Sequence, residues 1–392
     1  MLKGYTKAEK SWMLYDWANS AFATIIAAII LPIFFKEIAH QNGVSDVDAT
    51  AFWGYATSCG TLICAVLAPF MGTLGDFKGM KKRLFTFFML LGVISSALLA
   101  FTGNWKALLA LYVLGTLGFN GSCVYYDSFL LDVTTEERMD RVSTLGYGLG
   151  YIGGSTIPLV LSLLLIQFGD AIGIGTMLAT RISFLLTAGW WLVFTLPMLR
   201  YVYQKHGIDP ERNIVLHTLR NVKDTCCMIL KNKSVVFFII AYFFYIDGVG
   251  TIIHMATVFG DSCGLGSMDM MVVLLVVQIV AFPFAILYGK LAEKVGSRTM
   301  ILTGIATYIV VCFVAFRLST LRDFLILAVL VGTAQGGIQA LSRSFFGKLV
   351  PEESASEYFG FFDVFGKFSA VIGPALFGIV AQATGVSRYG IL

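Results

Sequence analysis

Three ionisable residues stand inside long apolar stretches of the chain, where their types can bind a charged solute or carry a proton. Asp247 lies 14 residues after Lys233, about 20 Å along a helix, and His254 follows seven residues later on the same helical face. Lys367 stands in another apolar stretch. In one interpretation the charges are structural, and Lys367 pairs with Asp247 or, at i,i+4, with Asp363. In the other, Asp247 takes up and releases a proton, or Lys367 binds the carboxylate of a substrate.

Neutral polar and aromatic residues also recur at helical spacing within apolar stretches. The amides of Gln335 and Gln339, at i,i+4, can hydrogen-bond an amino or carboxylate group, and they can equally join one helix to another. Asp16 and Asn19, at i,i+3, can line a cavity or accept hydrogen bonds from a nearby loop. Tyrosine rings can stack on a ligand or pack in the core. These further candidates for ligand contacts are Asp16, Asn19, Tyr126, Tyr151, Tyr245, Gln335 and Gln339.

The composition places these residues in a membrane. Of the 392 residues, 57% are apolar and 13% are charged, and the mean hydropathy is +0.80. A soluble domain is about half apolar and about a quarter charged, so a soluble, disordered or disulfide-scaffold protein is excluded. The formal net charge of +4 is too small to indicate a nucleic-acid partner. The seven cysteines are scattered without a CxxC or Cys/His pair, so we expect reduced thiols and no metal site.

Eleven apolar runs are long enough to cross the hydrocarbon core, which takes about 20 residues as a helix. They cover residues 12–35, 51–74, 84–102, 107–132, 142–167, 180–199, 234–259, 268–289, 299–316, 323–348 and 357–382. Most of the 28 lysine and arginine residues fall in alternate links, on the side of the membrane that holds the N-terminus. Because cytoplasmic links carry the excess of positive charge, we expect a cytoplasmic N-terminus, at the inner membrane if the protein is bacterial.

One long basic link separates six runs from the following five. It predicts an N-terminal six-helix bundle over residues 1–199, a cytoplasmic linker over 200–233 and a C-terminal bundle over 234–392. A helix on the inner leaflet is indicated by linker residues at helical spacing, namely Val215, Leu219, Val222, Cys226 and Ile229. Residues 385–392 resemble an outside turn and the start of a twelfth helix, so we expect a truncated sequence whose natural protein continues.

A short motif occurs twice, 217 residues apart, after the second and the eighth runs. Its copies are Gly72-Thr-Leu-Gly-Asp76-Phe-Lys-Gly79-Met-Lys81-Lys82 and Gly289-Lys-Leu-Ala-Glu293-Lys-Val-Gly296-Ser-Arg298. The acid can bind the N-terminus of a neighbouring helix, where unpaired N–H groups and the helix dipole favour negative charge. The glycines permit a tight turn, and the basic residues are expected to hold the link at the inner membrane surface. Two halves in parallel register are typical of transporters, whose halves rock about a central site.

Across its whole length the chain resembles the major facilitator superfamily. Two segments resemble the "unknown major facilitator" group, which includes the autophagy-related vacuolar effluxer of fungi: Tyr15-Asp-Trp-Ala-Asn-Ser-Ala-Phe22 and Gly336-Gly-Ile-Gln-Ala-Leu-Ser-Arg-Ser344. The superfamily resemblance implies twelve helices in two pseudo-symmetric six-helix bundles, alternating access, and a cavity lined by helices 1, 4, 7 and 10. The group resemblance implies efflux of amino acids. The chain departs from this pattern at Glu293, where aspartate is usual, and in the missing twelfth helix.

Asp127 and Arg343 occupy similar depths near the ends of the fourth and tenth runs. If the two halves are symmetric, these charges meet when the cytoplasmic side closes and separate when it opens, as a two-state switch requires. The alternative is that each residue pairs within its own half, Asp127 with Arg138 or Arg141.

The sequence contains no HExxH, GxSxG or phosphate-loop motif, so we expect neither an enzyme nor an ATP-driven pump, and no cofactor. It predicts a monomeric secondary active transporter for a small organic solute. An amino acid or similar zwitterion is favoured, because charges of both signs, amides and phenols lie in the expected cavity helices. Isolated acids favour protons over sodium as the coupling ion. The alternatives are a sugar or amphipathic drug exporter and, in another class, a non-transporting membrane receptor.

Overall fold

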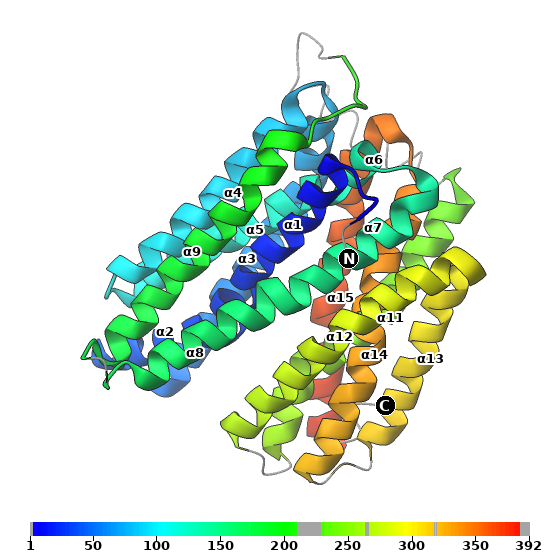
Figure 1. Ribbon diagram of the computed structural model, residues 1–392. Helices are drawn as coiled ribbons and strands as arrows, with labels where there is room; N and C mark the ends of the chain where they lie inside the picture. The colour runs from blue at the N-terminus through cyan, green and yellow to red at the C-terminus, as the bar shows by residue number, and fades with distance from the viewer. Residues whose placement is uncertain are drawn as a thin grey trace. The chain divides into compact units, whose positions relative to one another are not determined.

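The computed structural model describes residues 3–171, 173–209, 229, 231–262, 266–316, 318 and 320–384. Its regular elements are all helical: α1 (Lys7–Ala21), η1 (Phe22–Ile29), α2 (Ile30–Gln41), α3 (Asp46–Asp76), α4 (Met80–Leu98), η2 (Leu99–Phe101), α5 (Trp105–Ser128), α6 (Leu130–Val133), α7 (Glu136–Leu149), η3 (Gly150–Thr156), α8 (Ile157–Phe168), α9 (Gly175–Tyr201), α11 (Lys233–Ser262), α12 (Ser267–Val295), α13 (Ser297–Ala315), α14 (Leu321–Leu349), η4 (Glu352–Ser354) and α15 (Ala355–Thr384). Among the described residues, eleven helices are long and apolar enough to cross a membrane (Figure 1), which confirms the predicted runs and the all-α membrane fold.

Local signals in the sequence fix where spanning helices begin. At α1, Thr6 and Glu9 form a capping box in which each side chain accepts the backbone N–H of the other residue. Gly79 and Gly296 precede α4 and α13 with φ values of +78° and +88°, a backbone region that favours glycine. The two motif glycines therefore provide the tight turns that the sequence predicts.

The first and fifth spanning helices each contain a widened π-helical segment, η1 and η3. A hydrogen bond from Thr24 Oγ1 to Ser155 Oγ, 2.8 Å long, joins the two segments. A Cβ on Gly154 would overlap Ser20 and the backbone oxygen of Trp17, so glycine is needed for this close approach. Such widened turns are frequent at functional sites.

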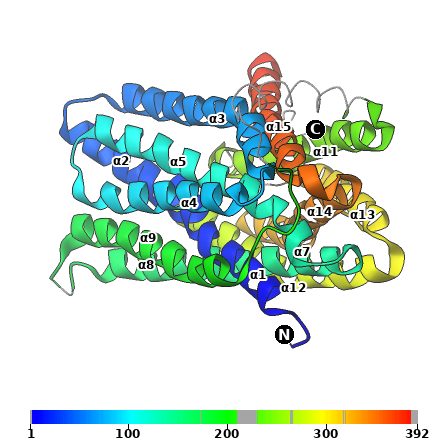
Figure 2. The same cartoon turned by 90° about the horizontal axis from the view of Figure 1, so that it is seen from above.

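The described helices form two compact units, and the first unit comprises Met1–Val133, Leu149–Val222 and Glu352–Gly360. Within it α4 and α3 pack on α5, and α1 and α4 pack on α9 (Figures 1 and 2). Its core is aromatic, because Trp12, Tyr15 and Trp191 are all fully buried.

The second unit comprises Thr134–Gly148, Lys223–Pro351 and Phe361–Leu392. Here α14 packs against α11, α12 and α13, and Figure 1 shows these helices side by side. One part of its core is an apolar cluster of α12, α13 and α14 with the link at Leu318: Met270, Val273, Ala315, Leu318, Phe324 and Ala328.

The two units differ from the bundles that chain order predicts, since each contains a short segment from the other half of the sequence. The division into bundles 1–199 and 234–392 therefore stays a prediction. The predicted linker helix lies largely in residues 210–228, outside the described residues, as do residues 385–392 with the predicted start of a twelfth helix.

Large apolar side chains are exposed along the spanning helices. On α4, Phe87 and Ile94 are 59% and 54% exposed, and on α11, Phe237 and Phe244 are 72% and 70% exposed. Contiguous apolar surface of this kind is rare on soluble proteins. Because lipid is the solvent that accepts it, these faces agree with a polytopic membrane protein.

Candidate functional site

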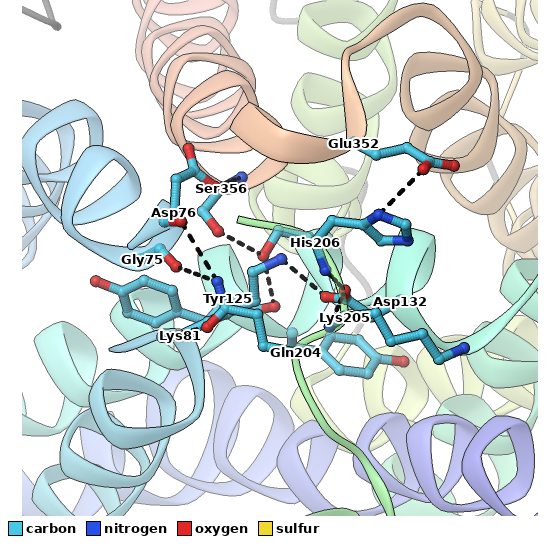
Figure 3. A network of polar contacts seen from close by, with 12 residues as sticks. Gly75, Asp76, Lys81, Tyr125, Asp132, Gln204, Lys205, His206, Glu352 and Ser356 are labelled. Carbon is cyan, nitrogen blue, oxygen red and sulfur yellow. Dashed lines mark hydrogen bonds and ion pairs between the residues drawn. The ribbon is translucent and has the colours of Figure 1, made fainter. Parts of the chain in front are cut away.

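The first motif copy places its acid against the start of another helix. Asp76 is the last residue of α3, and its two carboxylate oxygens accept the backbone N–H groups of Ser356, at 2.8 Å, and of Glu357, at 2.9 Å (Figure 3). Both donors lie in the first turn of α15, where N–H groups lack partners within the helix. This is the contact that the sequence expects of the motif acid, and Asp76 is only 2% exposed.

Glycines allow α3 and α15 to approach closely enough for this contact. A Cβ on Gly72 would overlap the backbone oxygen of Ser356 and the Cα of Glu357. A Cβ on Gly360 would likewise lie within 2.5 Å of the backbone oxygen of Ala68. Because backbone atoms meet on both helices, no rotation of a side chain would make room for a larger residue.

Lys81 of the same motif forms a buried ion pair with Asp132. The Lys81 Nζ and Asp132 Oδ2 atoms are 2.8 Å apart, and the two side chains are 1% and 0% exposed. The expectation that the motif bases hold the link at the membrane surface is therefore wrong for Lys81, because Asp132 draws its ammonium into the protein. Lys82 lies only partly buried, with Nζ 3.9 Å from the centre of the Tyr203 ring.

The segment that follows α9 completes this network. The second carboxylate oxygen of Asp132 accepts the backbone N–H groups of Lys205 and His206, at 2.7 and 3.0 Å. The Gln204 side chain accepts the N–H of Gly79 at 2.9 Å and donates to the Gly75 carbonyl at 3.2 Å (Figure 3). The segment after α9 therefore hydrogen-bonds backbone groups of the loop between α3 and α4 and the carboxylate of Asp132.

A further polar contact joins the same segment to the residues before α15. His206 Nδ1 lies 3.1 Å from Glu352 Oε2, and both side chains are partly exposed (Figure 3). None of Asp132, Gln204, His206 and Glu352 was predicted from the sequence to belong to a site. An acid within the apolar segment Leu130–Val133 was the one signal that pointed to Asp132.

The second motif copy has a different arrangement. Glu293 lies 3.8 Å from Arg141 of α7, and the two side chains are 39% and 47% exposed. Arg298 is exposed, as expected of a base at the surface. A Cβ on Gly289 would overlap Oγ1 of Thr144, so this glycine lets α12 approach α7. The acid of this copy therefore forms a surface ion pair.

Asp140 of α7 is the buried acid in the second unit. One of its carboxylate oxygens accepts the Ser344 hydroxyl at 2.6 Å, and the other accepts the Ser297 hydroxyl and the Lys348 ammonium, both at 2.6 Å. The side chain of Asp140 is 6% exposed. The sequence does not mark this residue as buried, because it stands among the charged residues of Glu136–Arg141 and not in an apolar run.

Arg343 lies on α14 and is bound to α7. Its guanidinium donates to the hydroxyl and the carbonyl oxygen of Ser143, at 2.9 and 3.1 Å, and lies 4.4 Å from the centre of the Tyr147 ring. Arg343 is 2% exposed. Asp127 is half-buried near the end of α5, in the first unit. The predicted gate between Asp127 and Arg343 joins residues of different units and stays a prediction.

In the second unit, Lys367 pairs with Asp363, one turn earlier on α15. Asp247 of α11 accepts the backbone N–H of Gly373 at 2.7 Å. Of the two pairings that the sequence left open for Lys367, the structure therefore contains the one with Asp363, while Asp247 contacts α15 six residues beyond Lys367. A Cβ on Gly373 would overlap Thr251, so glycine permits the contact between α11 and α15.

The remaining candidates of the second unit lie on α11 and α14. The Tyr245 and Ser342 hydroxyls are 2.6 Å apart. Gln335 is 7% exposed, and its side-chain oxygen is buried without a hydrogen-bond partner among the described residues. Gln339 is half-buried one turn later. His254 lies within α11, but its side chain is outside the described part of the structure.

Candidates of the first unit form a compact polar cluster. The Tyr126 hydroxyl donates to Asp16 at 2.7 Å, and the Tyr126 ring stacks on Trp12 with centres 4.4 Å apart. The Asn19 amide lies 3.6 Å from the sulfur of Cys123. Tyr151 is 8% exposed in η3. The structure thus brings Asp16 and Tyr126 into direct contact through α1 and α5.

Comparison with known proteins agrees with this architecture. The family model described as "Vacuole effluxer Atg22 like" matches residues 6–392. The chain is 47% identical to the "Uncharacterized MFS-type transporter YxiO" of Bacillus subtilis (strain 168), over 100% of this chain and 92% of the relative. It is 24% identical to autophagy-related protein 22 of Eremothecium gossypii, over 96% of this chain and 86% of that protein.

A solved structure shows the same fold. The proton:xylose symporter XylE, of the major facilitator superfamily, superposes with a TM-score of 0.72 at 12% identity, over 98% of this chain and 91% of the symporter. YxiO and XylE are both described as transporters of the major facilitator superfamily. The chain therefore belongs to the Atg22-like family of major facilitator superfamily transporters.

Proposed function

We propose that this transporter moves a small zwitterion, such as an amino acid, by alternating access, with protons as the coupling ion. The observation that carries the proposal is the side-chain oxygen of Gln335 on α14, which is buried without a hydrogen-bond partner in the described part of the chain. A buried acceptor without a donor costs about 1–3 kcal/mol, and the ammonium group of an amino acid would supply that donor.

The helices of the same unit offer charges for both ends of a zwitterion. Lys367 on α15 carries a positive charge and pairs with Asp363, one turn earlier on the same helix. Asp247 on α11 carries a carboxylate with one backbone donor, and its contact at Gly373 lies about 9 Å along α15 from Lys367. Ionisable groups at membrane depth usually face a partner or a pathway, which supports a role in binding or coupling.

Alternating access is supported by one buried carboxylate contact in each unit. In the first unit the start of α15 is held by hydrogen bonds to Asp76, and in the second unit α7 is held by hydrogen bonds from Ser297, Ser344 and Lys348 to Asp140. Water can replace each of these bonds, so both contacts can be made in one state and solvated in the other. The proposed Asp127–Arg343 gate would act in the same way.

A counterflow assay tests the substrate class. Purified protein is reconstituted into liposomes that contain one unlabelled solute, and entry of the same labelled solute is followed. We expect exchange of at least one neutral amino acid, and a reduction of about tenfold in Gln335→Leu, since its acceptor is lost. Gln167→Leu on α8 is the control, because it makes the same change at an exposed glutamine outside the candidate set. Exchange of a sugar, an organic anion or an amphipathic drug, with none of any amino acid, would contradict the proposal.

A second assay separates proton coupling from folding. In Asp247→Asn the carboxylate is lost while an oxygen remains to accept the N–H of Gly373. We expect this variant to exchange substrate across the liposome membrane but to lose uptake driven by a pH gradient. Gradient-driven uptake at the wild-type rate would remove Asp247 from the coupling mechanism.

A further inference from the structure

The start of α4 and the segment after α9 enclose a basic cavity. This cavity has no role in the transport mechanism proposed above. Its volume is about 530 Å³, and it is lined by Gly79, Lys82, Arg83, Thr86, Tyr203 and Gln204. Two of these six residues are cationic and none is acidic. We propose that this cavity binds the phosphodiester headgroup of an anionic phospholipid.

The charges of the cavity favour an anion. Arg83 is exposed, and among the described residues its guanidinium forms no ion pair or hydrogen bond. Lys82 has the Tyr203 ring as its neighbour instead of a carboxylate, with Nζ 3.9 Å from the ring centre. The acids close to these residues along the chain are already engaged: Asp76 accepts the N–H groups of Ser356 and Glu357, and Asp209 is bound to Lys78 at 2.7 Å. Neither acid lines the cavity. A phosphodiester would therefore find two cations that no other anion in the described structure neutralises.

The surface beyond the cavity favours a lipid over a soluble anion. Residues 79, 82, 83 and 86 lie on one face of α4, and Leu90 and Ile94 continue this face along the helix. These two side chains are 38% and 54% exposed. A headgroup in the cavity would thus place its acyl chains along exposed apolar side chains of a spanning helix.

The position of Tyr203 agrees with a membrane interface. Its ring is 62% exposed, two residues after the end of α9, which packs beside α4. Tyrosine is enriched where headgroups meet the hydrocarbon core, and basic pockets between spanning helices bind anionic headgroups. The cavity also shares Gly79 and Gln204 with the network around Asp76, so a bound lipid would brace the loop between α3 and α4.

Native mass spectrometry of the intact protein in neutral detergent tests the site. The probes are dioleoyl phosphatidylglycerol and, as the zwitterionic reference, dioleoyl phosphatidylcholine. We expect tighter binding of phosphatidylglycerol, and a loss of affinity of about 30-fold in Lys82→Gln/Arg83→Gln, since each basic residue near a membrane surface is worth about 1 kcal/mol. Affinity for phosphatidylcholine should not change.

Matched variants distinguish the site from a general loss of charge or of fold. Arg298→Gln removes an exposed positive charge at the start of α13 and should bind phosphatidylglycerol like the wild type. Arg83→Lys keeps the charge and should retain the affinity. Thermal melting in detergent without added lipid verifies the fold of each variant, and Arg83→Gln alone, with an expected loss of about fivefold, serves if the double variant does not fold.

Inorganic phosphate separates the two sources of a phosphate group. If millimolar phosphate fails to displace phosphatidylglycerol, the site requires the lipid. The proposal is overturned if phosphate displaces the lipid completely, because the cavity is then a site for a soluble anion. It is also overturned if the double variant binds phosphatidylglycerol as the wild type does, or if Arg298→Gln loses as much affinity.

Discussion

The two copies of the repeated motif share a sequence pattern but differ in what their acids bind. In the first unit Asp76 is buried and accepts two backbone N–H groups from the start of α15. In the second unit Glu293 is exposed and contacts Arg141 at 3.8 Å. The buried acid of that unit is Asp140, which lies on α7 and outside the motif. The repeated motif therefore keeps an acid at the same position in both copies, but the group that this acid binds differs between them.

This difference predicts an uneven dependence on the two copies. A buried carboxylate that loses its donors, or a buried cation that loses its acid, leaves a desolvated group without compensation. An exposed ion pair exchanges its partner for water at little cost. We therefore expect the first copy to contribute most of the stability and to control the position of α15.

The largest effect is expected at Lys81. Lys81→Met leaves Asp132 buried beside an apolar side chain, so we expect a loss of about 3–5 kcal/mol in the free energy of unfolding. Arg298→Met at the equivalent position of the second copy should change it by less than about 0.5 kcal/mol. Equilibrium unfolding in mixed micelles measures both. Adding Asp132→Asn to Lys81→Met should recover part of the loss, and a double variant as unstable as Lys81→Met would contradict the ion-pair explanation.

Asp76 should show the next largest effect. Asp76→Ala removes the acceptor of two N–H groups, and we expect a loss of about 2–3 kcal/mol, because hydrogen bonds to charged groups are the stronger ones. Asp76→Asn keeps one carbonyl acceptor and should lose less. The same unfolding experiment measures both variants. An Asp76→Ala variant as stable as the wild type would show that the contact with α15 is not formed in solution.

Alanine substitutions at the first glycines of the two copies should differ in whether a second substitution can restore the lost stability. Gly72→Ala and Gly289→Ala should each lose about 1–3 kcal/mol of stability, because both positions are overpacked by a Cβ. The neighbour of Gly289 is a side chain, so adding Thr144→Ala should relieve its defect. The neighbours of Gly72 are backbone atoms of Ser356 and Glu357, so no such truncation is available. Thermal melting of the variants measures the rescue, and a Thr144→Ala background that leaves Gly289→Ala unchanged would refute it.

The smallest effect is expected for the exposed pair of the second copy. A double-mutant cycle of Arg141→Gln and Glu293→Gln should give a coupling of about 0.2–1 kcal/mol, lower still in high salt, because the pair is exposed and screened. Equilibrium unfolding at low and high ionic strength measures it. A coupling above about 2 kcal/mol would mean that the two copies are equivalent after all.

The fold could be predicted because membrane helices are specified locally. Each spanning helix needs about 20 apolar residues, and the eleven runs satisfy this requirement without reference to one another. The turns at Gly79 and Gly296 are equally local, since their positive φ values favour glycine. The kind of group that Asp76 binds could also be predicted, because a carboxylate is stabilised by the free N–H groups at the start of a helix.

The partners of these residues could not be predicted, because they lie far away along the chain. Lys81 looked like a surface base until the fold placed Asp132 beside it, 51 residues away. Lys367 had two acids within plausible reach, and the packing of α11 on α15 selected Asp363 by directing Asp247 to Gly373. The burial of Asp140 could not be predicted, because an acid within a charged segment is expected to be exposed to solvent unless its neighbours in the fold are known.

Hydrogen–deuterium exchange of the amides at the start of α15 tests the central claim most directly. The amides of Ser356 and Glu357 donate to Asp76, so Asp76→Ala should accelerate their exchange by about 30-fold, equivalent to about 2 kcal/mol of lost protection. Glu293→Ala should leave exchange at the start of α7 unchanged. If Asp76→Ala leaves the amides of α15 as protected as in the wild type, or Glu293→Ala exposes α7 to the same degree, the proposed difference between the two motif copies is contradicted.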